Sequence, residues 1–109
     1  MRTIHKFPFE IKDEIHLQMP HGARAIAVQE QFGVLCFWVA VDTEAELVDH
    51  VFKARATRQR LDGTEGRHIG TVQQVRGHIV IHLFEEWLST GYQVPTSGAD
   101  GPALEVKEE

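Results

Sequence analysis

The fold is decided by one stretch of sequence, Val34-Leu35-Cys36-Phe37-Trp38-Val39-Ala40-Val41, an unbroken run of eight apolar residues. Its β-branched and aromatic side chains favour an extended strand, and the run is far too short to span a bilayer. Such a run predicts a central strand that is covered on both faces or paired across a subunit interface. Covering both faces requires either a second layer of the same chain or a second chain.

The sequence on the N-terminal side of this run alternates between apolar and polar residues. Within residues 3–11 the apolar side chains share one face, as in a half-buried strand, and Pro8 indicates an edge strand because it lacks a ladder donor. A short turn leads into a second alternating stretch, residues 14–19, so the two stretches are expected to pair as a hairpin. A third stretch, residues 24–31, reaches the apolar run through a turn at Gly33.

The sequence on the C-terminal side contains one ambiguous segment and one clear hairpin. Residues 43–55 are compatible with a short helix that has a threonine cap, but the alternation over residues 51–56 favours a turn followed by a strand. Residues 57–66 contain two glycines and few apolar side chains, which indicates a surface loop. Residues 67–73 and 78–84 are predicted to form a second hairpin.

These elements predict a mainly β fold, either a compact antiparallel β-sandwich or a partly open barrel, with about seven strands. The folded domain is expected to comprise residues 1–88. Residues 89–109 are rich in Gly, Pro, Ser and acidic side chains and lack periodicity, so they are expected to form a flexible acidic tail. The apolar run also predicts a homodimer formed through a sheet edge or an apolar sheet face.

The composition is that of one globular domain: the chain has 109 residues, of which 42% are hydrophobic and 25% are charged. The single cysteine excludes an intramolecular disulfide, and the N-terminus lacks the apolar core of a signal peptide. We therefore expect a cytoplasmic protein that does not associate with a membrane. The formal charge of −5 disfavours a general DNA-coating protein, which needs a basic excess to bind phosphates.

No catalytic or metal centre can be assembled from the sequence. His78 and His82 have the spacing that places two zinc ligands together on a helix, but on a strand the same spacing separates the rings by about 13 Å. Cys36 has apolar neighbours and is expected to be a buried structural thiol rather than a nucleophile. The sequence contains no serine nucleophile elbow, phosphate-binding glycine loop or paired cysteines, so we assign no catalytic residue, metal ligand or cofactor.

The strongest candidate for a site is a cluster of four positive charges within eight residues. This basic set comprises Lys53, Arg55, Arg58 and Arg60. Because guanidinium groups bind phosphate through paired hydrogen bonds, the set is expected to bind an anionic small molecule or a short single-stranded nucleic acid. Trp87 is the aromatic candidate for stacking against a base. The simpler interpretation is a solvated face whose charges are balanced by Asp49, Asp62 and Glu65.

Six segments of the chain carry a family resemblance. They are Thr3–Pro8, Met19–Ala23, Leu35–Trp38, Val41–Asp42, His68–Gln73 and His82–Glu85. Over roughly residues 2–85 the chain resembles a family of small proteins that are encoded by phages and prophages and have no assigned chemistry. The chain departs from this family at residues 56–60, where the family often has a Gly-Thr-Gly-His-like loop, so no role for that loop is carried over.

The resemblance implies a non-enzymatic accessory protein, because many small phage proteins bind and inhibit host components. The leading hypothesis is an inhibitor of host antiphage defence that sequesters a phosphate-bearing, nucleotide-like ligand in the host cytoplasm through the basic set. A first alternative is a module that binds and blocks a host protein through its sheet edge or acidic tail. A second alternative is a binder of short single-stranded nucleic acid.

Overall fold

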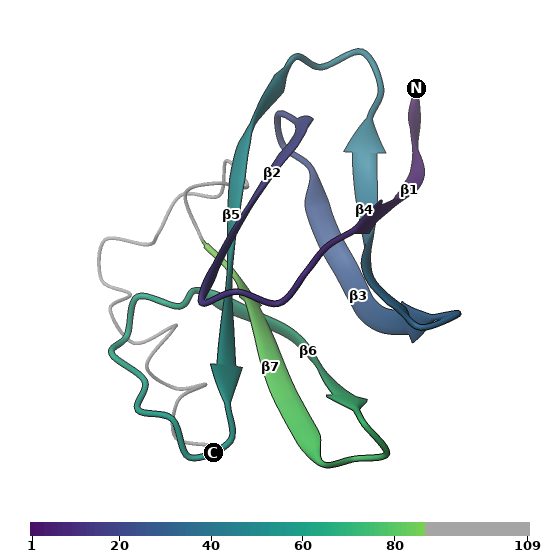
Figure 1. The fold of residues 1–109 in the computed structure, drawn as a ribbon. Coiled ribbons are helices and arrows are strands. Elements are labelled where there is room, and N and C mark those ends of the chain that lie inside the picture. The colour runs from purple at the N-terminus through teal and green to yellow at the C-terminus, as the bar shows by residue number, and fades with distance from the viewer. Residues whose placement is uncertain (87–109) are drawn as a thin grey trace.

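The computed structural model describes residues 1–86, which form seven antiparallel strands in two sheets (Figure 1). The strands are β1 (Arg2–Pro8), β2 (Glu14–Pro20), β3 (Arg24–Gln31), β4 (Val34–Asp42), β5 (Leu47–Ala56), β6 (Arg67–Gln74) and β7 (Ile79–Glu85). The predicted antiparallel β fold is therefore confirmed. Among the described residues, no helix has the length and apolar character needed to cross a membrane. The expected domain boundary at residue 88 and the expected tail lie outside the described residues.

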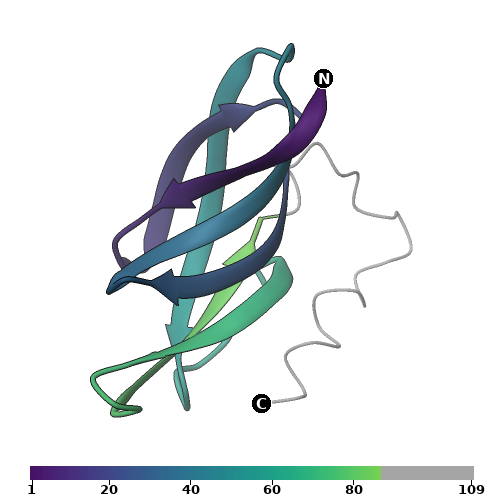
Figure 2. The ribbon, with the colours of Figure 1, turned by 90° about the vertical axis from the view of Figure 1, so that its right-hand side faces the viewer.

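The two sheets form the layers of a sandwich. The first sheet has the strand order β1-β4-β3, and the second has the order β2-β5-β7-β6. Figure 2 shows β1, β4 and β3 crossing in front of β2 and β5. The apolar run lies in β4, which is the central strand of the first sheet, as predicted. Pro8 ends β1, which is an edge strand, also as predicted.

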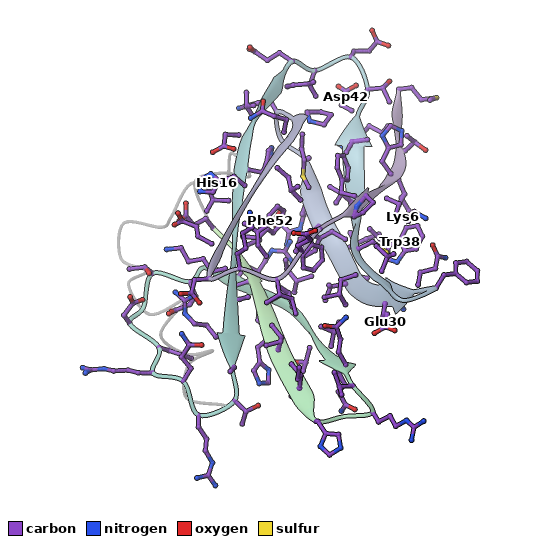
Figure 3. The ribbon with its side chains drawn as sticks, in the orientation of Figure 1. Lys6, His16, Glu30, Trp38, Asp42 and Phe52 are labelled. Atoms are coloured by element: carbon purple, nitrogen blue, oxygen red, sulfur yellow. The ribbon has the colours of Figure 1, made fainter. Side chains whose placement is uncertain are left out.

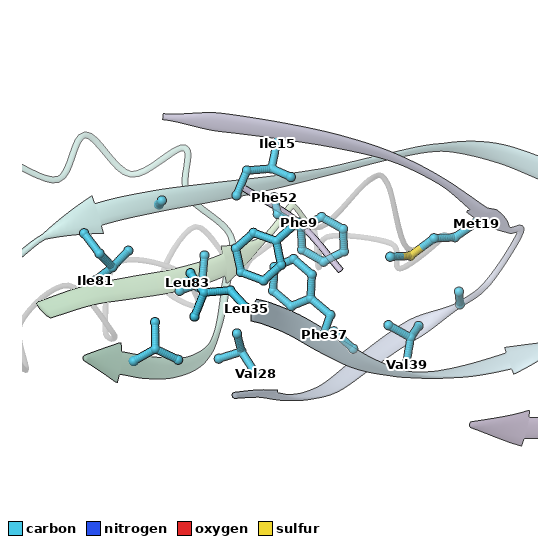
Figure 4. Close-up of a cluster of buried hydrophobic side chains, with 14 of the residues drawn as sticks. Phe9, Ile15, Met19, Val28, Leu35, Phe37, Val39, Phe52, Ile81 and Leu83 are labelled. Carbon is cyan, nitrogen blue, oxygen red and sulfur yellow. The ribbon is translucent and has the colours of Figure 1, made fainter. Parts of the chain in front are cut away.

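An aromatic stack occupies the core between the sheets (Figure 4). The ring of Phe37 on β4 lies between the rings of Phe9 and Phe52, with centroid separations of 4.2 and 4.3 Å and interplanar angles of 14° and 21°. The three residues come from the β1–β2 connection, β4 and β5, so the stack links both sheets. Complete burial of a large apolar side chain stabilises a fold by about 1.5–3 kcal/mol.

The alternating residues of β4 have different environments on its two faces. Leu35, Phe37, Val39 and Val41 point into the core and are buried. The intervening side chains point away from the core, where Trp38 is half-buried. Residues 1–86 therefore bury the inner face of the apolar run more completely than its outer face. The predicted homodimer, through a sheet edge or an apolar sheet face, stays a prediction.

The predicted hairpin between residues 3–11 and 14–19 does not form, and this prediction was wrong. β1 pairs with β4, whereas β2 pairs with β5 in the opposite sheet. The connection between β1 and β2 passes from one sheet to the other, because Phe9 is buried in the core and its N–H donates to the Leu35 carbonyl at 3.0 Å. Alternation identifies each strand, but it does not specify the strand with which it pairs.

The ambiguous segment after the apolar run is a turn followed by a strand, as the alternation predicted. Residues 43–46 form the turn, and β5 begins at Leu47. The side chain of Asp42 accepts the Glu44 N–H at 3.0 Å, and its carbonyl accepts the Ala45 N–H at 3.1 Å. An aspartate that binds the backbone two residues later competes with helical hydrogen bonding, which explains why no helix starts here.

The predicted closing hairpin is formed by β6 and β7, and a buried ion pair joins it to the first sheet. Glu85 is 0% exposed and pairs with Arg67. Its Oε2 accepts the Ala25 N–H at 3.2 Å, and Arg67 donates to the Ala25 carbonyl at 2.7 Å. Burial raises the pKa of Glu85, while the charge of Arg67 opposes this rise. The pair connects β3 to the β6–β7 hairpin, where the two sheets approach without a backbone ladder.

Candidate functional site

The loop of residues 57–66 lies beside the start of β2 and the end of β5, where there is a polar hollow of about 350 Å³. We call this cavity the loop hollow. Its lining consists of Asp13, Glu14, Lys53, Arg55, Gln59, Arg60 and Asp62. Three members of the basic set therefore meet at one cavity, and its volume falls within the range of about 300–1,000 Å³ that is typical of small-molecule sites.

Strand alternation and register bring the charged side chains of β5 to the loop hollow. Phe52 and Ala54 are buried in the core, so Lys53 and Arg55 point to the opposite face of the sheet. Figure 3 shows Phe52 among the central side chains and, on the neighbouring strand β2, His16 on the outer side. The β2–β5 register places Glu14 opposite Lys53.

Lys53 is held by three oxygen partners. Its Nζ lies 3.3 Å from Glu86 Oε2 and 3.9 Å from Glu14 Oε2. The same ammonium donates to Thr64 Oγ1 at 3.2 Å. Because only 13% of the side chain is exposed, Lys53 is fixed at the wall of the cavity rather than extended into solvent.

Arg55 is held in the same way, by a carboxylate and by backbone carbonyls. Its Nε donates to Glu65 Oε2 at 3.3 Å, and a terminal nitrogen donates to the carbonyls of Asp13 at 3.3 Å and Ala54 at 3.0 Å. Only 12% of the Arg55 side chain is exposed. The guanidinium therefore joins β5 to the chain segment that precedes β2 and to the loop.

Glu65 organises the loop from within. Its two carboxylate oxygens accept the N–H groups of Asp62 at 3.1 Å and Gly63 at 3.0 Å, in addition to the bond from Arg55. The residue is only 2% exposed. Successive backbone N–H groups beside a guanidinium are the donors that commonly bind a phosphate. Here those donors bind the chain's own carboxylate, so a ligand in the loop hollow contacts other groups.

Asp62 shapes the rim of the cavity. Its Oδ1 accepts the Thr64 N–H at 3.0 Å and the Thr64 hydroxyl at 2.7 Å. These hydrogen bonds, led by that from the hydroxyl, hold the pKa of Asp62 far below its usual range. The carboxylate is therefore ionised at neutral pH and can accept hydrogen bonds only.

The remaining predicted site residues have different positions. Arg60 is exposed and lines the loop hollow. Arg58 is also exposed, but it does not line the cavity, and its backbone has a φ of 75°. Trp87 lies outside the described residues. The structure thus brings Lys53, Arg55 and Arg60 together, with Arg58 on the same loop.

The charges of the cavity wall are balanced. The three cationic side chains face three carboxylates, which come from Asp13, Glu14 and Asp62. Of the acids expected to offset the basic set, Glu65 pairs with Arg55, whereas Asp49 lies 2.8 Å from a ring nitrogen of His16. Such a wall offers both donors and acceptors to a polar ligand.

His82 and the cysteine have structural partners. His82 is hydrogen-bonded to the hydroxyls of Thr57 at 2.8 Å and Thr71 at 2.9 Å. Within residues 1–86, no group of three or more His, Cys, Asp or Glu side chains is arranged to hold a metal ion. Cys36 is buried, as predicted, and its thiol lies 3.6 Å from the Gln29 carbonyl.

Sequence reasoning missed several residues of the cavity wall. Glu14 begins β2 and Asp13 directly precedes it, about forty positions before Arg55, and only the pairing of β2 with β5 brings them there. Gln59 was missed because its side chain is uncharged, although it lines the cavity and accepts the Ala56 N–H at 2.9 Å. A usable signal did exist in Asp62-Gly63-Thr64, since aspartate two residues before a threonine is typical of a side-chain-stabilised turn.

Comparison with known proteins identifies a family. The model of a domain of unknown function, DUF7352, matches residues 1–93, so the chain belongs to this family. No curated protein and no solved structure matches the chain. The match covers all seven strands of the sandwich and the whole lining of the loop hollow.

Proposed function

For this member of the DUF7352 family, we propose a non-enzymatic binding protein whose loop hollow takes a phosphate-bearing, nucleotide-like ligand. One observation carries the proposal: the cavity has three cationic side chains and three carboxylates in its wall. The cations are Lys53, Arg55 and Arg60, and the carboxylates are those of Asp13, Glu14 and Asp62.

A nucleotide offers both kinds of polar group that this lining can bind. Its phosphate oxygens accept hydrogen bonds, which suits the guanidinium of Arg60. Its ribose hydroxyls and base amino groups donate hydrogen bonds, which suits carboxylates such as Asp13 and Glu14. A bare anion fits less well, because the same carboxylates repel it. The proposed ligand therefore carries hydroxyl or amino groups as well as phosphate.

The ordered side chains of the cavity wall favour a protein that binds its ligand without catalysing a reaction. Lys53 and Arg55 are already held by Thr64, Glu65 and neighbouring groups, so a ligand immobilises few additional rotamers. Arg60 is exposed and adjusts to the ligand from the rim. Trp87, which lies outside the described residues, stays the stacking side chain that the sequence predicts.

The setting proposed for this activity follows from the phage-family resemblance. The protein acts in the host cytoplasm, where it sequesters a signalling nucleotide of antiphage defence. A buried free thiol at Cys36 is compatible with that reducing compartment. Because sequestration requires only tight binding, the proposal needs no catalytic residue.

Isothermal titration calorimetry on the full chain tests the proposal. The panel contains cyclic and linear nucleotides, ribose phosphate, inorganic phosphate and a short single-stranded oligonucleotide. We expect at least one nucleotide to bind, and Arg60→Ala to weaken it by about tenfold or more, the cost of one charge-assisted contact. The matched control is Arg58→Ala, which removes the same charge from the same loop outside the cavity lining.

Three results contradict the proposal. The first is silence across the whole panel. The second is equal weakening by Arg60→Ala and Arg58→Ala, which indicates diffuse attraction to the loop. The third is preferential binding of the oligonucleotide with an affinity that depends on its length, which supports the single-stranded nucleic-acid alternative instead.

A further inference from the structure

We propose that two hairpin tips form a second binding surface, which takes a protein segment that presents an apolar side chain next to a lysine or arginine. The tips are the β3–β4 turn at residues 31–34 and the β6–β7 turn at residues 74–79. This surface shares no lining residue with the loop hollow, so it extends beyond the proposed nucleotide site.

The first tip exposes an aromatic side chain on a strained backbone. Phe32 has a φ of 52° and Gly33 a φ of 81°, the positive values of a two-residue hairpin turn that favours Asn-Gly. A phenylalanine in this left-handed conformation costs conformational energy, and Phe32 is 97% exposed. Neither the backbone conformation at residue 32 nor burial in the core accounts for a phenylalanine at this position.

The second tip repeats this combination. Val75 has a φ of 53°, although a β-branched residue is a true outlier in the left-handed region, and it is 63% exposed. The turn is well defined, because the Gly77 N–H donates to the Gln74 carbonyl and the His78 N–H to the Val75 carbonyl, each at 3.1 Å. Strained, exposed apolar residues at both tips point to a function that requires them.

The two tips belong to one surface. Figure 2 shows both hairpins projecting toward the same side of the molecule. A hollow of about 360 Å³ touches both of them, and we call it the tip hollow. Its lining includes Phe9, Glu10, Ile11, Val34, Leu35 and Gln74. An apolar side chain that enters the tip hollow therefore contacts apolar groups at its base and has Phe32 and Val75 nearby on the adjoining turns.

The charge of the tip hollow defines the partner. Glu10 is the charged residue among those that line it, so a partner that places a lysine or arginine beside its apolar side chain gains a complementary contact. An anionic bilayer is disfavoured, because a flat surface does not fill a concave hollow that Glu10 lines. An apolar anchor in a pocket with a paired charge at its rim is the usual centre of a protein interface.

Selection from a displayed library of random peptides tests the proposal with the full chain as bait. We expect enrichment of peptides with an aromatic or aliphatic residue beside Lys or Arg. Fluorescence anisotropy of an enriched peptide should show a loss of affinity of about tenfold or more for Phe32→Asn/Val75→Asn. Because asparagine tolerates a positive φ, this variant should also melt roughly 2–5 °C higher than the wild type, which separates lost contacts from misfolding.

Two further variants sharpen the result. Ile4→Thr removes an exposed apolar side chain from β1 and should leave the affinity unchanged. Glu10→Lys should reverse the charge preference of the selected peptides. The proposal is overturned if no such peptide is enriched, or if the tip variant binds as well as the wild type. It is equally overturned if the tips mediate sedimentation with anionic vesicles or concentration-dependent self-association in place of peptide binding.

Discussion

Glu65 shows how one buried carboxylate organises a polar loop. It binds two backbone N–H groups and the guanidinium of Arg55, and together these contacts hold the loop against β5. The sequence places Glu65 next to the basic set, but it does not show which cation the carboxylate binds. That choice depends on the side of β5 from which Arg55 projects, and therefore on which of its residues are buried in the core.

Replacement of Glu65 by alanine should destabilise the protein. The change leaves the N–H groups of Asp62 and Gly63 without their acceptor and Arg55 without its carboxylate, at an expected cost of about 1–3 kcal/mol. Urea unfolding at neutral pH measures this difference. Glu44→Ala removes an exposed acid from another turn and should change the stability by less than about 0.5 kcal/mol. Equal stability of the two variants would show that the Glu65 contacts contribute nothing.

His50 gives the fold a dependence on pH. It is 0% exposed, its Nε2–H donates to the Pro20 carbonyl at 3.2 Å, and its Nδ1 has no hydrogen-bond partner. Burial lowers its pKa from the ordinary value of 6.5; the hydrogen bond to the Pro20 carbonyl opposes this most, while His21 lowers the pKa further and Asp49 raises it. The stability contributed by neutral His50 is therefore complete above pH 6.5 and is lost as the pH falls toward the lower pKa of the folded state.

We expect His50→Leu to flatten the acid side of the stability profile. The free energy of unfolding of the wild type should fall more steeply than that of the variant between about pH 7.5 and pH 5. His16 acts in the opposite direction, because hydrogen bonds to Glu14 and Asp49 raise its pKa, but it is present in both proteins and cancels in the comparison. His78→Asn, at an exposed turn position, should retain the wild-type slope. Parallel profiles for wild type and His50→Leu would exclude His50 as the source.

At the scale of elements, the sequence predicted the strands better than their pairing. Residues 24–31 match β3, and the closing hairpin has the expected position, because local alternation and turn residues specify both. The wrong hairpin between residues 3–11 and 14–19 arose because Phe9 continues the alternation of the first strand, while in the fold it leaves that strand and enters the core. The burial of Phe9 depends on how the two sheets pack together, so the neighbouring residues in the sequence do not predict it.

The junction between the loop and β6 depends on glycine at one position. Gly66 has a φ of 97°, and a Cβ there would lie 2.2 Å from the Glu85 carbonyl oxygen. Gly66→Ala should therefore cost about 2–4 kcal/mol, since a backbone atom cannot move aside easily. Gly63→Ala is the matched control: its φ is 89°, but no atom lies within 4 Å of the added carbon.

The control separates a steric clash from backbone strain. Gly63→Ala should cost only about 1 kcal/mol, which is the penalty for alanine in a left-handed conformation. Urea unfolding measures both variants. Similar losses at the two positions would mean that the close approach of Gly66 to β7 contributes nothing beyond the strain.

At the scale of the whole molecule, the sequence predicted a β-sandwich or a partly open barrel, together with the basic part of the candidate site. The basic set was visible because four cations are close together in sequence, and the alternation of residues 51–56 puts Lys53 and Arg55 on one face of β5. The acidic half of the loop hollow was not visible, because Asp13 and Glu14 reach it only through the β2–β5 pairing. The strained tips at Phe32 and Val75 were also missed, since turn geometry at these residues contradicts their usual preferences.

The predicted homodimer can be tested on the outer face of the first sheet. Ile4 on β1 is 56% exposed and lies opposite Ala40 on the central strand, so pairing this face with a second copy would bury apolar surface. Light scattering at micromolar concentration should return twice the 12.4 kDa mass of one chain. Ile4→Lys should weaken the dimer by about tenfold or more. If light scattering of the wild type returns the mass of a single chain, the predicted homodimer is contradicted.

The central claim, that the loop hollow binds a nucleotide, is tested most directly by following backbone amide resonances of the full chain during a nucleotide titration. We predict that saturable shifts concentrate at residues 53–64 and at the start of β2, which together surround the cavity. Shifts confined to the hairpin tips, or no saturable shift at any nucleotide concentration reached, would contradict it.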